Sequence, residues 1–431
     1  MTKVLVFTYY WPPSGGPAVQ RWLALTEHLP SLGIEPIIIT VDEKYASYFL
    51  LDPALEKRIP KNTRVFKTKT FEILSLYKKS VGQGVLPTAG FANESQPGLL
   101  KKAARWVRGN LFFPDPRKAW NKYAIKAAKK LIKEENIQAV ITAGPPQSTH
   151  LIGQQLQKEF NLFWICDFHD AWVNVWYYNE LFKTNIARKI DLRMEREVLE
   201  KADYILTVGR QIIQDFSQKI TDSSKIHLHS MGYDEERFGQ GANPSKTEFT
   251  ISYTGTMASH YQPKVFFQAI KELSQESELK LCVNFYGLIA DDIQEEVQEL
   301  GLDSMVHFAG YVSHNEVVEA LMSSCMLLLV SPNTPQAKMI IPGKIYEYMA
   351  TRLPILNLAS SETESALILD ECQAGMTFSR DQKSELKSFI NHQYKIWEED
   401  ASQLLNQDKT YLKYGRKTEA ALLAKLILQG S

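Results

Sequence analysis

Short apolar runs alternate with longer amphipathic runs along the chain, and this alternation limits the possible folds more than any other feature. A strand, a helix and a further strand in succession predict a parallel sheet with helices on both faces. In the first half, helices are expected over Ala18–Leu32 and Ala119–Glu135. The expected strands there are Val4–Thr8, Glu35–Thr40, Thr63–Lys67, Ala139–Thr142, Phe163–Phe168 and Tyr204–Val208.

The same alternation starts again after Gly239–Ser245, whose composition is typical of a linker. Because 431 residues are too many for one ordinary core, we expect two α/β domains with Rossmann-like, doubly wound sheets, over 1–240 and 246–405. A helix within 406–431 should pack back on the N-terminal domain. The expected strands of the second half are Phe249–Thr254, Leu279–Tyr286, Met305–Ala309, Met326–Val330 and Pro354–Leu358, and the helices are Pro263–Ser274, Asp291–Leu300, His314–Met322, Gly343–Ala350 and Tyr411–Leu428.

Charge and cysteine content exclude several classes of function. The 49 Lys and Arg residues balance 49 Asp and Glu residues, and no nucleic-acid recognition motif accompanies them, so nucleic acid is not an expected partner. The four cysteines lack CxxC spacing and no cluster of metal ligands is visible, which predicts buried free thiols and no bound metal. No segment approaches the ~20 apolar residues of a membrane helix. We therefore expect a cytoplasmic protein.

Basic residues crowd the stretch 101–133, where Asp115 is the only acid. Aromatic residues, among them Trp106 and Phe113, are interleaved with them. Such a surface suits anionic lipid headgroups or lipid-diphosphate acceptors, and a solvated helix face is the alternative. A peripheral position on the inner face of the membrane therefore stays open.

Loops that follow the strands of the first half carry the first candidate residues, because ligands of open α/β sheets bind at the carboxyl ends of strands. Gly15 and Gly16 precede an expected helix, whose N-terminus attracts anions such as a diphosphate. A plain turn is the alternative. His150 follows the strand Ala139–Thr142, and an ordinary helix position is the alternative for it.

A further loop, Asp167–Trp172, gathers acid, imidazole and indole groups after a strand. Asp170 is expected to orient or charge-stabilise His169, while Trp172 stacks on a sugar. The alternative is a helix-capping Asp and a packing Trp.

In the second half, two segments suit a nucleotide ligand. Gly255, followed by Thr256, allows a close approach of the backbone at the end of a strand. Gly343 opens an expected helix on which Lys344 and Glu347 lie one turn apart. The carboxylate of Glu347 suits a ribose diol and Lys344 suits a phosphate, with an exposed Glu–Lys surface pair as the alternative.

These residues resemble glycosyltransferase family 4, retaining enzymes of the GT-B architecture, over nearly the whole chain. The resemblance rests on Val4–Phe7 with Gly15-Gly16, Tyr253-Thr254-Gly255, Phe285-Tyr286-Gly287, Val306–Val312, and Gly343 through Glu347–Ala350 to Leu353-Pro354-Ile355. The chain is also similar to a bacterial subgroup that builds surface glycans. This similarity rests on Tyr10–Pro13, Arg21-Trp22, Asp115, Arg117 and Asp167–Trp172.

The resemblance implies a hexosyltransferase-like enzyme that uses a UDP- or GDP-sugar in an interdomain cleft, without a cofactor or metal, and glycosylates a glycan or lipid-linked acceptor. Glu347 would bind the donor ribose, Tyr311 and Val312 would lie near the base, and Lys264 would supplement the phosphate contacts. On the acceptor side, His169 and Asp170 would position the acceptor or steady developing charge. The expected acceptor contacts are Trp172, His150 and Arg117.

The chain also departs from the family pattern. Met339 stands where the first glutamate of a Glu-x7-Glu pair is usual, and the basic pair after Tyr253-Thr254-Gly255 is reduced to Lys264, with His260 nearby. Arginine is expected where His169 stands in the bacterial subgroup. A nucleotide-sugar epimerase and a non-catalytic nucleotide-sugar-binding partner are therefore the alternatives.

Overall fold

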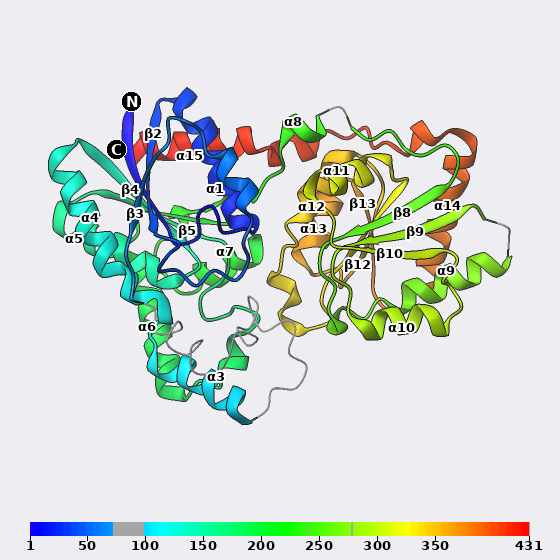
Figure 1. The fold of residues 1–431 in the computed structure, drawn as a ribbon, viewed down its shortest axis with the longest axis horizontal. Coiled ribbons are helices and arrows are strands. Elements are labelled where there is room, and N and C mark those ends of the chain that lie inside the picture. The colour runs from blue at the N-terminus through cyan, green and yellow to red at the C-terminus, as the bar shows by residue number, and fades with distance from the viewer. Residues whose placement is uncertain (72–98, 240, 277–278, 431) are drawn as a thin grey trace. The chain divides into compact units, whose positions relative to one another are not determined.

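The computed structural model describes residues 1–71, 99–239, 241–276 and 279–430. These residues form two compact units (Figure 1), of which the first comprises Met1–Met231 with Arg416–Ser431 and the second Gly232–Gly415. The last helix therefore belongs to the first unit although it follows the second unit in the chain. The segment Gly239–Ser245 lies inside the second unit, where Ala242 and Asn243 donate their amides to the carbonyls of Thr351 and Met322 at 2.9 and 2.8 Å.

The sheet of the first unit has, among the described residues, seven parallel strands in the order β3-β2-β1-β4-β5-β6-β7. Its central strands are buried on both faces, which explains their nearly continuous apolar sequences. The strands are β1 (Thr2–Thr8), β2 (Ile34–Val41), β3 (Arg64–Thr68), β4 (Ile137–Gly144), β5 (Phe163–Phe168), β6 (Tyr204–Thr207) and β7 (Ile226–Leu228).

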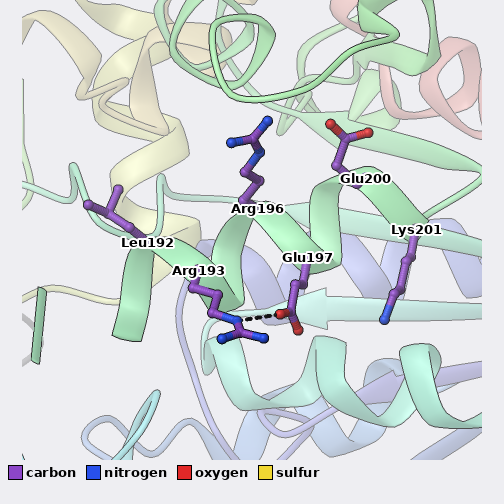
Figure 2. A pocket seen from close by; sticks show the side chains of 6 residues that line it. All are labelled: Leu192, Arg193, Arg196, Glu197, Glu200 and Lys201. Atoms are coloured by element: carbon purple, nitrogen blue, oxygen red, sulfur yellow. Dashed lines mark hydrogen bonds and ion pairs between the residues drawn. The ribbon is translucent and has the colours of Figure 1, made fainter. Parts of the chain in front are cut away.

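Helices cover this sheet, and the last one packs beside the first. Ala420, Leu423 and Ile427 of the last helix share one apolar cluster with Trp22 and Leu25 of the first. The outward face of α6 lines a shallow hollow of about 440 Å³ (Figure 2). The helices are α1 (Pro17–His28), α3 (Leu99–Leu111), α4 (Asn121–Glu134), α5 (His150–Phe160), α6 (Asn185–Lys201), α7 (Arg210–Ser217) and α15 (Arg416–Gly430).

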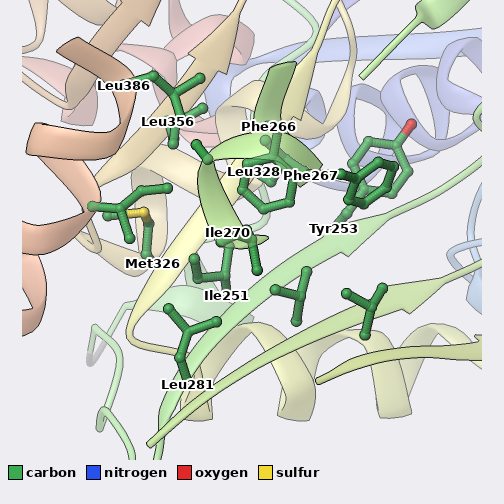
Figure 3. Close-up of a cluster of buried hydrophobic side chains, with 14 of the residues drawn as sticks. Ile251, Tyr253, Phe266, Phe267, Ile270, Leu281, Met326, Leu328, Leu356 and Leu386 are labelled. Atoms are coloured by element: carbon green, nitrogen blue, oxygen red, sulfur yellow. The ribbon is translucent and has the colours of Figure 1, made fainter. Parts of the chain in front are cut away.

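The sheet of the second unit repeats the same winding, with the described strands in the order β10-β9-β8-β11-β12-β13, all parallel. Its core packs Ile251, Phe266 and Met326 between the sheet and its helices (Figure 3). The strands are β8 (Phe249–Thr254), β9 (Leu281–Tyr286), β10 (Val306–Gly310), β11 (Met326–Val330), β12 (Ile355–Leu358) and β13 (Gly375–Phe378). The helices are α8 (Glu235–Phe238), α9 (Lys264–Glu276), α10 (Asp291–Glu299), α11 (His314–Ser323), α12 (Lys344–Thr351), α13 (Glu364–Glu371) and α14 (Lys383–Asp400).

The expected fold class, two doubly wound parallel α/β sheets, is confirmed. The short strands β7 and β13 were not predicted, because neither contains a run of buried apolar residues. The prediction of buried free thiols is also confirmed, since all four cysteines are free and buried. In the described part of the chain, no helix is long and apolar enough to cross a bilayer.

Candidate functional site

Each sheet reverses its strand order at one point, between β1 and β4 in the first unit and between β8 and β11 in the second. The loops at the carboxyl ends of these strands diverge there and leave room for a ligand. All of the loops singled out in the sequence follow strands of these two sheets. The site is therefore built from these loops, one unit at a time.

The two glycines before α1 have different structural roles. Gly15 donates its amide to the carbonyl of Leu50 at 3.0 Å, and an added Cβ would lie 3.0 Å from the Leu50 side chain. Gly16 has a φ of +111°, a conformation that favours glycine, and open space lies where its Cβ would be. The Gly15 amide is therefore occupied, and Gly16 is the glycine that leaves the start of α1 accessible.

A buried charged cluster joins α1 to the end of β5, and we call it the Arg21 cluster. Arg21 donates through Nη1 to both carboxylate oxygens of Asp167 at 2.8 and 2.6 Å, and Trp22 Nε1 donates to Asp167 at 3.0 Å. The guanidinium also contacts ring nitrogens of His169 and His229. Burial alone would raise the pKa of Asp167, but Arg21 and His169 hold it well below its usual range.

The last helix completes the Arg21 cluster. Ser230 donates its hydroxyl to the Glu419 carboxylate, and Nε2 of His229 lies 3.0 Å from the Glu419 carbonyl oxygen. Burial raises the pKa of Glu419 to about 7 and lowers that of His229 to about 3. These opposite shifts both favour neutral forms, so Arg21 and Asp167 are the fixed charges of the cluster.

His169 lies at the edge of the Arg21 cluster, and one of its two ring nitrogens makes no hydrogen bond to the described residues. Its Nε2 lies 3.0 Å from Asp167 Oδ2, whereas Nδ1 is buried without a hydrogen-bond partner among the described residues. The sequence assigned the orientation of His169 to Asp170, but Asp167 holds the ring in the structure. The reason is that Asp167, the penultimate residue of β5, binds Arg21 and Trp22 of α1, which the strand pattern did not reveal. Burial raises the pKa of Asp170, and nearby His169 opposes this shift.

His150 and Trp172 are both buried beside this edge. Nδ1 of His150 lies 3.0 Å from Thr142 Oγ1, and its ring lies 4.0 Å from that of Phe168. Burial lowers the pKa of His150 to about 3, so the ring is neutral at physiological pH. Its Nε2 lacks a hydrogen-bond partner in the described part of the chain. Contact of either residue with an acceptor stays a prediction.

Arg117 is held in an aromatic surround near the end of β1. Its guanidinium carbon lies 4.7 Å from the ring centre of Phe49 and 5.4 and 5.6 Å from those of Tyr9 and Tyr10. Nη2 donates to the carbonyl of Ser47 at 3.3 Å, while Nε has no hydrogen-bond partner among the described atoms. The position supplies a cation among rings that suit contact with sugars.

In the second unit, three successive strands end in glycines that interlock. Gly255 donates its amide to the carbonyl of Tyr286, and Gly287 donates to that of Gly310, both at 2.7 Å. The φ angles of these glycines are +102°, +129° and +69°. A Cβ on Gly287 would lie 2.3 Å from the Gly255 carbonyl oxygen. The close packing forms a low, side-chain-free rim after β8.

Lys344 places a cation on this rim. Its Nζ donates to the carbonyl of Thr254 at 2.6 Å and lies 3.5 Å from the ring centre of Tyr253. Burial lowers the pKa of Lys344, and it forms no ion pair in the described structure. A Cβ on Gly255 would lie 3.5 Å from Nζ, so glycine leaves the ammonium open. An anion bound here would oppose the effect of burial on the pKa of Lys344 and favour its charged form, so the position suits an anionic ligand.

Comparison with known proteins relates part of the second unit to a described family. Residues 248–393 match the family described as "Glycosyl transferases group 1" (Glyco_trans_1_4). These residues lie within the second unit, which is therefore similar in sequence to group 1 glycosyltransferases. No curated protein sequence matches the chain significantly.

The fold of this chain is similar to that of several solved structures. HepE from Anabaena, in complex with UDP, is 13% identical with a TM-score of 0.60, and both chains are covered completely. A glycosyltransferase from Rickettsia africae is 14% identical with a TM-score of 0.62, over 100% of this chain and 99% of the other. The lipopolysaccharide outer core galactosyltransferase WaaB is 13% identical with a TM-score of 0.56, over 98% and 100%. These likenesses show the GT-B fold.

The other predicted donor residues lie around the same strand ends. Gly343 precedes α12, and Glu347 lies in its first turn, half-buried. Thr256 is exposed after Gly255, and its carbonyl accepts the Tyr253 hydroxyl at 2.8 Å. Tyr311 is 82% exposed after β10, with Val312 half-buried beside it. An exposed ring at this edge suits stacking on a base.

Lys264 and Met339 differ from the rim residues. Lys264 starts α9, is mostly exposed, and its Nζ lies 3.7 Å from Glu296 of α10. Its charge therefore already has a partner. Met339 ends a short 3-10 helix after β11 and offers a thioether in place of a carboxylate.

Several charged residues of these loops and clusters were missed in the sequence. Asp167 was treated as part of a loop, and its partners Arg21, His229 and Glu419 lie far away in the chain, so no local spacing links them. Arg380 was missed because the strand before it, β13, was not expected. The hollow on α6 offers no alternative site, because its described lining belongs to one helix and includes the Arg193–Glu197 ion pair (Figure 2).

Proposed function

We propose that the protein transfers a sugar, with retention at the anomeric carbon, from a UDP- or GDP-sugar to a glycan or lipid-linked acceptor in cell-surface polysaccharide synthesis. The observation that carries the proposal is the ammonium of Lys344 on the glycine rim after β8. When the bond between the sugar and the diphosphate breaks, negative charge grows on the leaving phosphate. A positioned cation and the N-terminus of α12 stabilise that charge.

The first unit provides the acceptor side in this proposal. The unused Nδ1 of His169 and the aromatic surround of Arg117 support it, because they offer a polar contact and ring faces at strand ends. His169 would accept a hydrogen bond from the acceptor hydroxyl and position it, with Trp172, His150 and Asp170 around it. We assign no covalent nucleophile.

Nucleotide binding tests the proposal. We expect one of UDP, GDP, ADP and TDP to raise the melting temperature of the protein, because a ligand that binds the native state stabilises it. The shift should be largest for UDP or GDP. No shift with any nucleotide at millimolar concentration would contradict a donor site in the second unit.

The assignment of Glu347 to the ribose diol is tested separately. Glu347→Ala should weaken binding of the preferred nucleotide by roughly tenfold or more, since it removes hydrogen bonds to a charged group. The 2′-deoxynucleotide is the matched control: its affinity should fall much less in the variant. Equal losses for both nucleotides in calorimetric titrations would rule out the diol contact.

A non-catalytic sugar-nucleotide-binding role is the second candidate, and Met339 is the observation that favours it. A thioether cannot accept strong hydrogen bonds from the hydroxyls of the transferred sugar. Under this alternative the protein binds the nucleotide but releases no free nucleoside diphosphate from any donor. Steady release of UDP or GDP that depends on an acceptor would exclude the alternative.

Membrane contact is proposed through α3 and α4. Trp106 and Leu111 of α3 are exposed, and Lys122, Lys126 and Lys130 of α4 are exposed as well. Vesicles of phosphatidylglycerol should therefore retain the protein in flotation assays, whereas phosphatidylcholine vesicles should not. Retention should fall when Lys126 and Lys130 are replaced by Glu, and an unchanged retention would contradict the proposal.

A further inference from the structure

A guanidinium lies across the loops at the carboxyl edge of the second sheet. Arg380 comes two residues after β13 and donates through Nη2 to the carbonyls of Tyr261 and Ser331 at 2.5 and 2.8 Å. Its Nε lies 3.3 Å from the carbonyl of Gln262. Arg380 thus spans from the edge strand β13 to the loops after β11 and β8.

The charge of Arg380 is not neutralised by any described residue. Its hydrogen-bond partners are three uncharged carbonyls, and no ion pair includes it among the described residues. The adjacent Asp381 carboxylate accepts the Ser379 hydroxyl instead. Partial burial lowers the pKa of Arg380, and no carboxylate opposes that shift. Nη1 has no hydrogen-bond partner within the described structure, so two N–H donors remain for a ligand.

Arg380 and Lys344 are attached to the ends of neighbouring strands. Leu327 of β11 lies opposite Ser252 of β8, and extending this register by four residues places Ser331 opposite Thr256. Lys344 is hydrogen-bonded to the carbonyl of Thr254 at the end of β8. Lys344 and Arg380 therefore bind backbone carbonyls at the ends of the two strands that flank the switch point.

The loop after β8 has no free cation of its own in this region. Lys264, its basic residue, is directed to Glu296 of α10. Arg380 instead rests on the backbone of Tyr261 and Gln262, in this same loop. A cation from a distant part of the chain thus contacts the backbone of the loop after β8.

We propose that Arg380 binds the diphosphate of the nucleotide-sugar donor together with Lys344, and takes over the part of the basic pair that is missing after β8. The proposal rests on the donor site described under the proposed function. A guanidinium with a free Nη1 edge binds phosphate oxygens with directed hydrogen bonds, whereas the ammonium of Lys344 acts as a point charge. Arg380 would also order the loops after β8 and β11 through its carbonyl contacts.

The test compares nucleoside diphosphates with monophosphates in calorimetric titrations of the full chain. Arg380→Gln should weaken binding of the preferred diphosphate about tenfold more than binding of its monophosphate, which is about 1.4 kcal/mol of lost preference. Arg380→Lys should recover part of the preference, because the charge remains. Lys383→Gln is the matched control, since Lys383 starts the helix after Arg380 but pairs with Glu272 at 2.5 Å, and it should leave both affinities unchanged.

The outcomes separate the two proposals. If the unmodified protein binds no nucleotide, the donor site and this inference both fail. If it binds a diphosphate and Arg380→Gln weakens the diphosphate and monophosphate equally, or neither, then Arg380 only braces the loops and this inference alone fails. A selective loss for the diphosphate, with partial recovery in Arg380→Lys, supports it.

Discussion

The charged residues of the two units are arranged in opposite ways. In the first unit, the buried guanidinium of Arg21 meets a carboxylate at 2.6 Å and two imidazoles. In the second unit, Lys344 and Arg380 have hydrogen bonds only to backbone carbonyls among the described residues. Both arrangements lie at the carboxyl ends of strands in sheets of the same winding.

The difference distinguishes charges that are paired within the protein from charges that have no oppositely charged partner among the described residues. A buried cation that is already paired stabilises its surroundings, and removal of either partner exposes the other to an apolar interior. A cation with neutral partners keeps much of its charge for an anion that arrives later. The same edge of the sheet therefore carries a paired charge cluster in the first unit and cations with only neutral partners in the described part of the second unit.

The largest expected effect is on the stability of the first unit. Arg21→Met leaves the buried carboxylate of Asp167 without its cation and should lower the free energy of unfolding by about 3–5 kcal/mol. Urea denaturation measures this loss. The double variant Arg21→Met/Asp167→Asn should recover part of it, because no lone charge remains. A stable Arg21→Met protein would contradict a stabilising role for the paired charges.

The next effect sharpens the role of Glu419 in the same cluster. Its pKa is raised by burial to about 7, so the stability that comes from the protonated form is complete at acid pH and is lost as the pH rises through about 7. Relative to Glu419→Gln, the natural protein should therefore lose about 2–3 kcal/mol of stability between pH 5 and pH 8. A pH-independent difference between the two proteins would mean that Glu419 is ionised throughout.

A smaller effect is expected in the second unit, on binding rather than stability. Lys344→Met should change the melting temperature little, because no buried carboxylate is left behind. The dissociation constant of the preferred nucleoside diphosphate should rise about 10- to 100-fold, as expected for the loss of a hydrogen bond to a charged group. A large loss of stability with unchanged nucleotide binding would mean that Lys344, like Arg21, is a structural charge, and would contradict the contrast between the two units.

The smallest effect is expected on the outer face of α6. Arg193 pairs there with Glu197 at 2.8 Å in full solvent. Arg193→Ala should change neither the melting temperature nor nucleotide affinity measurably, because exposed pairs contribute little. A loss of affinity would move the site toward the hollow in Figure 2.

The sequence predicted central strands well and side-chain partnerships poorly. Three strands were predicted with the bounds that the structure has, because buried parallel strands are continuous apolar runs. They are Phe163–Phe168, Phe249–Thr254 and Met326–Val330. The edge strand β13 is only partly buried and gave no such run. Arg380 was missed with it.

The partners of His169 could not be found from spacing either. Asp167 is bound by Arg21, which lies 146 residues earlier. Nothing local distinguishes a carboxylate that points across the sheet from one that caps the next helix. The glycines at the ends of β8, β9 and β10 were visible in the sequence, but only the structure shows that Gly255 and Gly287 donate their amides to carbonyls at the end of the neighbouring strand.

The place of α15 has a consequence for the order in which the protein is made. Residues 416–430 complete the core and the charged cluster of a unit whose other residues precede position 232. During synthesis the core of the first unit therefore stays incomplete, with Trp22 and Arg21 only partly covered, until all of Gly232–Gly415 has been translated. The first and last segments of the second unit are joined by a parallel bridge between Tyr233 and Gly415. This unit can therefore fold first, in contrast to the usual N-terminal-first order. A nascent chain arrested before residue 416 should thus be protease-resistant in its second unit and sensitive in its first.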